Sequence, residues 1–316
     1  MSLITSHKEG TDMQENALAT RDDFIAIKHL VLDGLDSDHS KRMYDRSLTD
    51  FLAWYKEQGH TRLDKATVQT YRAELQARNL AASSINQRLS AIRKLAAEAA
   101  DNGLMDPSLA AGVSRVKGAK MAGTRTGNWL TREQAQELLN APDTATLKGL
   151  RDQAILAVLL GSGLRRSEAA ALTFEHVQQR EGRWILVDLV GKGNRVRTVP
   201  LPSWAKAALD NWATEAGLTG GLIFRAVHKG GYVNGQSMTD QAVADVVRFY
   251  AGKLGFGLAA HDLRRTFAKL AHKGNARLEQ IQLSLGHASI KTTERYLGVQ
   301  QDLTDAPCDH LGLRLG

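Results

Sequence analysis

Residues 21–112 carry four successive apolar stripes at helical spacing, and no alternating strand pattern separates them. The stripes are formed by Phe24, Ile27 and Val31; by Tyr44, Leu48, Phe51, Leu52 and Tyr55; by Val68, Tyr71 and Leu75; and by Ile85, Leu89, Ile92 and Leu95. Gly59 and Gly103 are expected to end the second and fourth helices. Short-linked amphipathic helices of this kind bury their apolar faces against one another. The segment therefore predicts a compact four-helix bundle.

The rest of the chain divides around this bundle. At 316 residues the chain is long enough for two domains. Residues 1–20 are polar and weakly patterned, which predicts a flexible tail. Residues 113–128 contain basic residues, no acidic residue and several glycines, so they predict a basic linker. We therefore expect a second domain over residues 129–316.

The second domain combines helices with one hairpin. Thr131 and Gln134 form a predicted capping box near its start. Residues 183–201 contain two apolar runs on either side of a glycine-rich turn, which predicts a β-hairpin. Further helices are expected near 203–216 and 239–253. The predicted fold class is mainly α with a small β component, an α+β chain.

The segment from His261 to Tyr296 predicts three short helices. Leu263, Phe267 and Leu270 recur at helical spacing, so the first helix has a buried stripe and places His261 and Arg264 on one face. A second helix ends at Gly286, and Ser289 is expected to cap the helix that carries Tyr296.

Six side chains in the second domain have the chemistry needed to attack a DNA phosphodiester. They are Arg165, Lys192, His261, Arg264, His287 and Tyr296. The attack places extra negative charge on the phosphate, and the planar guanidinium of arginine can hold two phosphate oxygens at once. Tyrosine is a weak nucleophile and needs a neighbouring base and a positive field, which histidine and arginine supply. Each residue alone also has an ordinary structural explanation, so the prediction depends on their joint occurrence.

Four motifs that contain these residues resemble those of the tyrosine site-specific recombinases, the phage-integrase and Xer-type family. They are Gly163-Leu164-Arg165-Arg166-Ser167-Glu168; Gly191-Lys192-Gly193-Asn194 followed by Val199-Pro200-Leu201; His261-Asp262-Leu263-Arg264; and Leu285-Gly286-His287-Ala288-Ser289-Ile290-Lys291-Thr292-Thr293-Glu294-Arg295-Tyr296. All four occur in the family's order within the C-terminal half of the chain. One difference is Arg265, which stands where many members have histidine.

The resemblance implies a SAM-like core-binding bundle over residues 21–112, followed by a DNA breaking-rejoining catalytic domain. It also implies that Tyr296 attacks the scissile phosphate, forms a 3′-phosphotyrosyl link and releases a 5′-hydroxyl. His261 would help to accept the tyrosine proton.

The resemblance assigns the remaining residues to the phosphate and the leaving group. Arg165 and Arg264 would clamp the phosphate, and His287 would donate a hydrogen bond to a phosphate oxygen. Lys192 would protonate the leaving oxygen. The implied partner is double-stranded DNA, bound by a tetramer of this chain or together with a second related recombinase.

No cofactor is expected. A phosphotyrosine link retains the energy of the broken bond, so neither ATP nor a metal is needed, and the sequence has no Walker loop and no cluster with metal-ligand spacing. The single cysteine, Cys308, fits a reducing compartment. No apolar run reaches membrane-spanning length, so we expect a cytoplasmic protein without a membrane partner.

Basic residues favour a polyanionic partner, because 41 Lys and Arg outnumber 34 Asp and Glu. The outer faces of the predicted bundle carry Lys41, Arg42, Arg46, Arg72, Arg88, Arg93 and Lys94. These residues either contact DNA phosphates or form an ordinary solvated face, and the basic linker either follows the DNA backbone or is a plain connector.

Three functions remain open from the sequence. The first is a site-specific recombinase that integrates, excises or resolves a DNA element. The second is DNA relaxation of the type IB topoisomerase kind, which uses the same nucleophile. The third is a DNA-binding module without catalysis.

Overall fold

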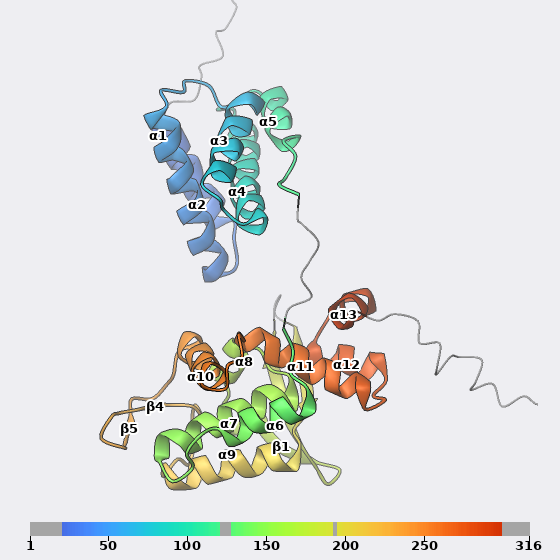
Figure 1. The fold of residues 1–316 in the computed structure, drawn as a ribbon. Coiled ribbons are helices and arrows are strands. Elements are labelled where there is room, and N and C mark those ends of the chain that lie inside the picture. Colours follow the sequence, from blue (N-terminus) through green and yellow to red (C-terminus); the bar gives the residue numbers. More distant parts are fainter. Residues whose placement is uncertain (1–20, 121–127, 192–194, 299–316) are drawn as a thin grey trace, which may run out of the picture. The chain divides into compact units, whose positions relative to one another are not determined.

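The computed structural model describes residues 21–120, 128–191 and 195–298. The chain divides into two compact units, Met1–Thr124 and Arg125–Gly316 (Figure 1). Each unit has its own apolar core, and both are built mainly from helices.

The first unit is a helical bundle. Its helices are α1 (Arg21–Asp33), α2 (Asp38–Glu57), α3 (Lys65–Ala77), α4 (Ala82–Asp101) and α5 (Pro107–Ser114). The apolar stripes of the first four helices meet in one core, where Leu48, Phe51 and Leu89 are fully buried. The four predicted helices are confirmed. The fifth was not predicted, because its eight residues are too few to show a helical period, although Asp106 caps it and Pro107 opens it.

The segment after α5 packs on the same bundle instead of leaving it as a connector. Val116 and Ala119 are buried in the core of the first unit. The Asn86 side chain makes two hydrogen bonds to the backbone of Ala119. Its Nδ2 donates to the Ala119 carbonyl at 3.0 Å, and its Oδ1 accepts from the Ala119 amide at 2.7 Å. Arg93 donates to the Val116 carbonyl at 2.6 Å. The first part of the predicted linker, through Ala119, is therefore ordered on α4.

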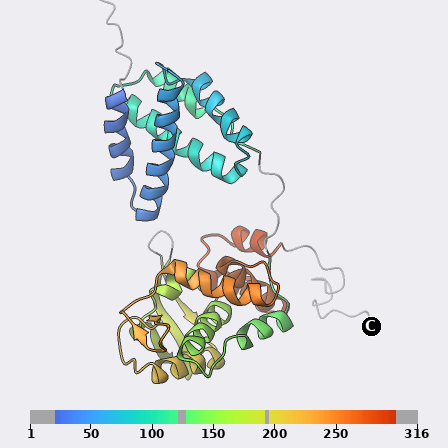
Figure 2. The same ribbon diagram turned by 60° about the vertical axis from the view of Figure 1, so that its left-hand side comes forward.

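The second unit surrounds one buried helix, α7 (Leu147–Ser162). Helices α6 (Arg132–Asn140), α8 (Arg166–Ala170), α9 (Ser203–Glu215), α10 (Asp240–Lys253) and α11 (Ala260–Lys273) all pack against it (Figure 2). Because α7 contacts neighbours on every side, its apolar residues Ala154 to Leu159 are almost completely buried. The predicted capping box at Thr131 and Gln134 is confirmed at the start of α6.

A three-stranded antiparallel sheet lies beside these helices, in the order β1 (Val177–Arg180), β2 (Arg183–Val190), β3 (Val196–Pro200). The predicted β2–β3 hairpin is confirmed, and its register shifts between Leu186 and Leu189. A short ladder of β4 (Ala226–Val227) and β5 (Val233–Asn234) precedes α10.

The unit ends with α12 (Leu278–Leu285) and α13 (Ile290–Leu297), so the three predicted helices of this segment are confirmed. Ser289 occupies the N-cap position of α13, but its side chain makes no capping hydrogen bond, so that detail of the prediction is wrong. Within the ranges that the structure describes, no helix has the length and apolar character needed to cross a bilayer.

Candidate active site

Arg165 is held at a sharp turn between two helices. Helix α7 ends at Gly163, whose φ of 60° lies in the left-handed region, and Arg165 is the N-cap residue of α8. Glu168 closes this turn, since its Oε2 accepts from the Arg165 amide at 2.8 Å and its Oε1 accepts from Arg165 Nη1 at 2.6 Å. The Arg165 side chain keeps 28% of its surface exposed, so it can still reach a ligand.

Arg264 lies deeper, in the first turns of α11, and is only 1% exposed. Its Nη1 donates to the Gly163 carbonyl at 2.7 Å, and its Nη2 donates to the Leu285 carbonyl. The Nε atom is buried and has no hydrogen-bond partner among the described residues. Arg264 therefore joins the end of α7 to the end of α12, which excludes the alternative of a solvated surface arginine.

The two histidines flank the ring of Tyr296. The ring centroids lie 5.6 Å apart for His261 and 5.4 Å apart for His287, both in edge-on geometry. His261 Nε2 lies 3.4 Å from the Tyr296 hydroxyl oxygen, which also lies 3.4 Å from the His261 carbonyl. His287 Nδ1 lies 2.9 Å from the hydroxyl of Thr293, a polar residue that is fully buried.

Burial and positive charge together set the ionisation of this cluster. Burial raises the pKa of Tyr296, although Arg264 and Arg265 oppose the rise, so the hydroxyl is protonated at neutral pH. Burial and the nearby Arg264 lower the pKa of His261, and the same causes lower the pKa of His287 to about 4. Burial also lowers the pKa of Arg264, to about 9, which leaves it charged. At pH 7 the site therefore holds neutral histidines beside cationic arginines.

Sequence reasoning gave no role to several residues that the structure places in the cluster. Glu168 bridges Arg165 to Arg197 of β3, and Thr293 binds His287. The guanidinium carbon of Arg265 lies 5.0 Å from the centroid of the Tyr296 ring. A signal for Arg197 was present, because it lies two residues before buried Val199 in β3 and so shares the inner face of the strand.

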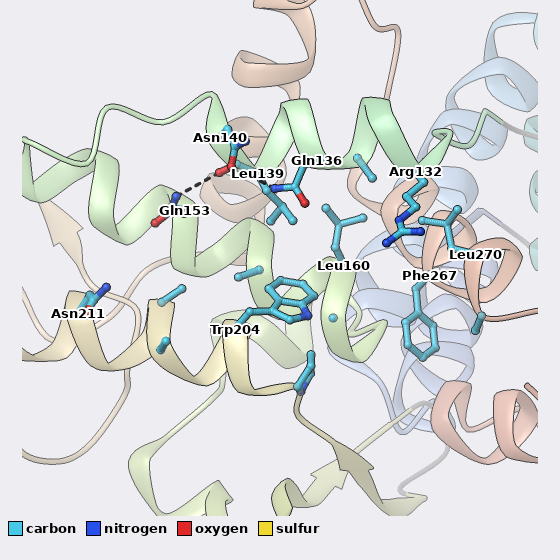
Figure 3. A pocket seen from close by; sticks show the side chains of 17 residues that line it. Arg132, Gln136, Leu139, Asn140, Gln153, Leu160, Trp204, Asn211, Phe267 and Leu270 are labelled. Atoms are coloured by element: carbon cyan, nitrogen blue, oxygen red, sulfur yellow. Dashed lines mark hydrogen bonds between the residues drawn. The ribbon is translucent and has the colours of Figure 1, made fainter. Parts of the chain in front are cut away.

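The structure thus brings Arg165, His261, Arg264, His287 and Tyr296 into one cluster, while Lys192 lies outside the described residues. A hollow of about 170 Å³ beside this cluster is lined by Arg165, Arg197 and His287, among others. A larger hollow of about 810 Å³ lies elsewhere, among α6, α7, α9 and α11, where Trp204 and Phe267 line it (Figure 3). None of the five candidate residues that the structure describes lines that larger hollow.

The lowered pKa of His287 predicts a loss of stability in acid. The unfolded chain takes up the proton near the ordinary histidine pKa of about 6.5, whereas the folded protein resists protonation down to about 4. Stability conferred by the neutral ring is therefore present above pH 6.5 and is lost as the pH falls from there towards 4. We expect His287→Gln to flatten this dependence in urea unfolding at pH 7, 6 and 5. His272→Gln, at an exposed position on α11, is the matched control and should leave the slope unchanged.

Comparisons with known proteins cover both units. The family model described as the phage integrase family matches residues 128–302, and the model of the phage integrase N-terminal SAM-like domain matches residues 27–103. A tyrosine recombinase of Synechococcus elongatus is 32% identical over 96% of this chain and 98% of its own. The tyrosine recombinase XerC of Xylella fastidiosa strain 9a5c is 33% identical over 87% of this chain and 90% of its own.

Solved structures show the same fold. A lambda integrase dimer bound to a core site aligns with a TM-score of 0.69 at 14% identity, covering 90% of this chain and 98% of that one. The XerH recombinase bound to a difH substrate aligns with a TM-score of 0.66 at 18% identity, covering 90% of this chain and 82% of that one. With a family model matched over more than half of its length and full-length relatives above 30% identity, the chain belongs to the phage integrase family of tyrosine recombinases.

Proposed function

We propose that this enzyme cuts and rejoins duplex DNA at specific sites through a 3′-phosphotyrosyl intermediate on Tyr296. The observation that carries the proposal is the placement of the Tyr296 hydroxyl beside His261 within the field of Arg264 and Arg265. Membership of the tyrosine recombinase family supports it independently. The biological outcome that we propose is integration, excision or resolution of a DNA element.

In the proposed reaction His261 is the base that accepts the proton of the Tyr296 hydroxyl. Tyr296 is protonated at neutral pH and needs a base, and the lowered pKa of His261 leaves its ring neutral and able to accept a proton. The separation of 3.4 Å is long for a hydrogen bond, and we expect it to shorten when DNA binds. The tyrosine oxygen then bonds to phosphorus, and the sugar O5′ leaves. Lys192 is the proposed donor of the proton to that leaving oxygen.

Three side chains are proposed to stabilise the charge on the phosphate. Arg165 is the more exposed arginine and binds the phosphate oxygens directly. Arg264 supplies positive charge from its buried position. Direct contact between Arg264 and a phosphate oxygen requires a small movement of the side chains that cover it. His287 contributes Nε2–H, because we assign the Thr293 hydroxyl as the donor to Nδ1, which leaves the ring proton on Nε2.

The DNA partner is proposed on two grounds. XerH was solved bound to a palindromic difH substrate, and lambda integrase was solved as a dimer bound to a core site. In the first unit of this chain, Arg42 and Arg46 are exposed on α2 and free to meet phosphates in solution. Arg88 is a weaker candidate, since it pairs with Asp50 at 2.9 Å.

A tetramer on DNA is the proposed assembly. Exchange between two duplexes requires cleavage at four strand positions, and each cleavage uses one Tyr296. Light scattering on complexes with two synapsed duplexes should give the mass of four protomers plus that of the two duplexes. A complex that stays at one protomer per duplex would contradict the tetramer without affecting the chemistry.

Covalent trapping tests the reaction. We expect nicked duplexes drawn from the DNA flanking the gene to give a protein–DNA adduct that survives denaturation, because the nick lets the short strand diffuse away before rejoining. The test is gel electrophoresis after denaturation, followed by sequencing of the trapped strand. Adducts at one sequence support recombination. Adducts spread over all sequences, together with relaxation of supercoiled plasmid, would favour the topoisomerase alternative. Tight binding without any adduct would favour a DNA-binding module without catalysis.

A further inference from the structure

Glu168 is a buried carboxylate shared between two arginines. Its side chain is 3% exposed, and each of its oxygens accepts two hydrogen bonds. Oε1 accepts from Arg165 Nη1 at 2.6 Å and from Arg197 Nη1 at 2.7 Å. Oε2 accepts from the Arg165 amide at 2.8 Å and from Arg197 Nη2 at 2.8 Å. Burial raises the pKa of Glu168, but the hydrogen bonds from Arg197 and Arg165 outweigh it and bring the pKa to about 2.

Arg197 connects this carboxylate to a third element. Its side chain is 9% exposed, and its Nε donates to the Ser284 carbonyl of α12 at 2.9 Å. One guanidinium therefore fixes β3, the start of α8 and the end of α12 relative to one another. Because α12 ends at Gly286, directly before His287, the same contact fixes the turn that presents His287.

Two glycines leave room for the Arg197 side chain. A Cβ built on Gly286 would lie 2.9 Å from Arg197 Cδ, and Gly286 also has a φ of 62°. A Cβ on Gly191 would lie 3.3 Å from Arg197 Nη1 and 3.2 Å from Arg165 Nη1. The close approach of the backbone at both positions indicates a site built tightly around this side chain.

Charge balance gives Arg197 a second effect. Two guanidinium groups and one carboxylate leave a net charge of +1 in the cluster of Arg165, Glu168 and Arg197. Without Arg197, Glu168 would pair with Arg165 alone, and the pair would be neutral. Arg197 thus keeps positive charge available for an anion at Arg165, while its own Nε, Nη1 and Nη2 already donate to the Ser284 carbonyl and to Glu168.

We propose that Arg197 is a positioning residue for strand cleavage. It holds Glu168 so that the Arg165 side chain stays oriented and its positive charge is not neutralised by Glu168. This inference rests on the proposed function, since it concerns the rate of the Tyr296 reaction. Arg197 acts on the phosphate through Arg165 and on the His287 turn through Ser284, and not by contact with DNA.

The test separates the rate of cleavage from the affinity for DNA. We expect Arg197→Met to lower the single-turnover rate of adduct formation at saturating nicked DNA about 100-fold, as misplacement of a catalytic group does. The Kd for the same DNA should change less than about threefold, because Arg197 does not touch the ligand. An unchanged rate, or a loss that appears only in Kd, overturns the proposal.

A double-mutant cycle tests the route through Glu168. Glu168→Gln in the Arg197→Met background removes the carboxylate that would neutralise Arg165, so the double variant should cleave faster than Arg197→Met alone. A double variant whose losses simply multiply contradicts action through Glu168.

Folding and the underlying reaction need separate controls. Thermal unfolding checks each variant. If Arg197→Met does not fold, Arg197→Lys is the variant that tests the proposal. Lysine keeps the positive charge but cannot bind both carboxylate oxygens of Glu168 and the Ser284 carbonyl at once. We expect it to lose about tenfold in rate at unchanged Kd, and a wild-type rate overturns the proposal. Failure of the wild-type chain to form any adduct would instead contradict the proposed function itself.

Discussion

Tyr296→Phe is expected to abolish the covalent protein–DNA adduct while leaving DNA binding intact. The substitution removes only the hydroxyl oxygen, which is the proposed nucleophile. The phenylalanine ring keeps its edge contacts with His261 and His287 and its position beside Arg265. We therefore expect adduct formation to fall at least ~1,000-fold, a loss typical of a removed nucleophile.

The measurement is denaturing electrophoresis of labelled nicked duplex, with Kd measured on the same duplex. Tyr232→Phe is a matched control, because Tyr232 is an exposed tyrosine beside the β4–β5 ladder, away from the cluster. An adduct of normal yield on the Tyr296→Phe protein would exclude Tyr296 as the nucleophile.

Arg264→Met is expected to weaken both the fold and the reaction. Loss of the guanidinium leaves the carbonyls of Gly163 and Leu285 without their donor, and each buried unpaired group costs about 1–3 kcal/mol. Removal of a buried charge returns part of that cost. We expect a net loss of about 2–4 kcal/mol in the free energy of unfolding. The rate of adduct formation should fall about 1,000-fold, because the positive field at the phosphate is lost.

Urea unfolding measures the first effect, and single-turnover trapping below the unfolding transition measures the second. Arg166→Met is the control, since Arg166 forms an exposed pair with Asp240 at 3.1 Å and should change stability by less than ~1 kcal/mol. Equal stability of the Arg264→Met protein and the wild type would mean that the two carbonyls find other partners.

Periodicity made most of the fold predictable. The first four helices and the β2–β3 hairpin follow from apolar spacing and glycine stops, which are local signals. Helix α5 was missed because its eight residues are too few to show a helical period. The ordered segment through Ala119 was missed because its order depends on contacts with α4 that are distant in sequence, above all the paired hydrogen bonds between Asn86 and Ala119.

The sequence predicted the site residues that belong to a recognisable motif. It did not predict the roles of residues that act by holding another side chain in place. The two histidines, the two arginines and Tyr296 could be singled out by chemical type, and the structure brings these five together. The roles of Glu168 and Arg197 could not be predicted, because they depend on a shared hydrogen-bond network that joins positions 29 residues apart. Strand alternation could only have placed Arg197 on the inner face of β3. The prediction for Lys192 stays a prediction, since that residue lies outside the described part of the chain.

The two helix ends that meet at Arg264 explain how a buried cation can stand without a carboxylate of its own. Helices α7 and α12 both finish in left-handed glycines, and their last carbonyls point at one guanidinium. The C-terminal end of a helix carries roughly half a negative charge, spread over several peptide groups. Each helix is a dipole with no net charge, so two such ends stabilise the arginine as water would without adding a formal negative charge beside it. A DNA phosphate that approaches this region therefore meets an arginine whose formal charge is not paired with a carboxylate and which the backbone holds in place before the substrate arrives.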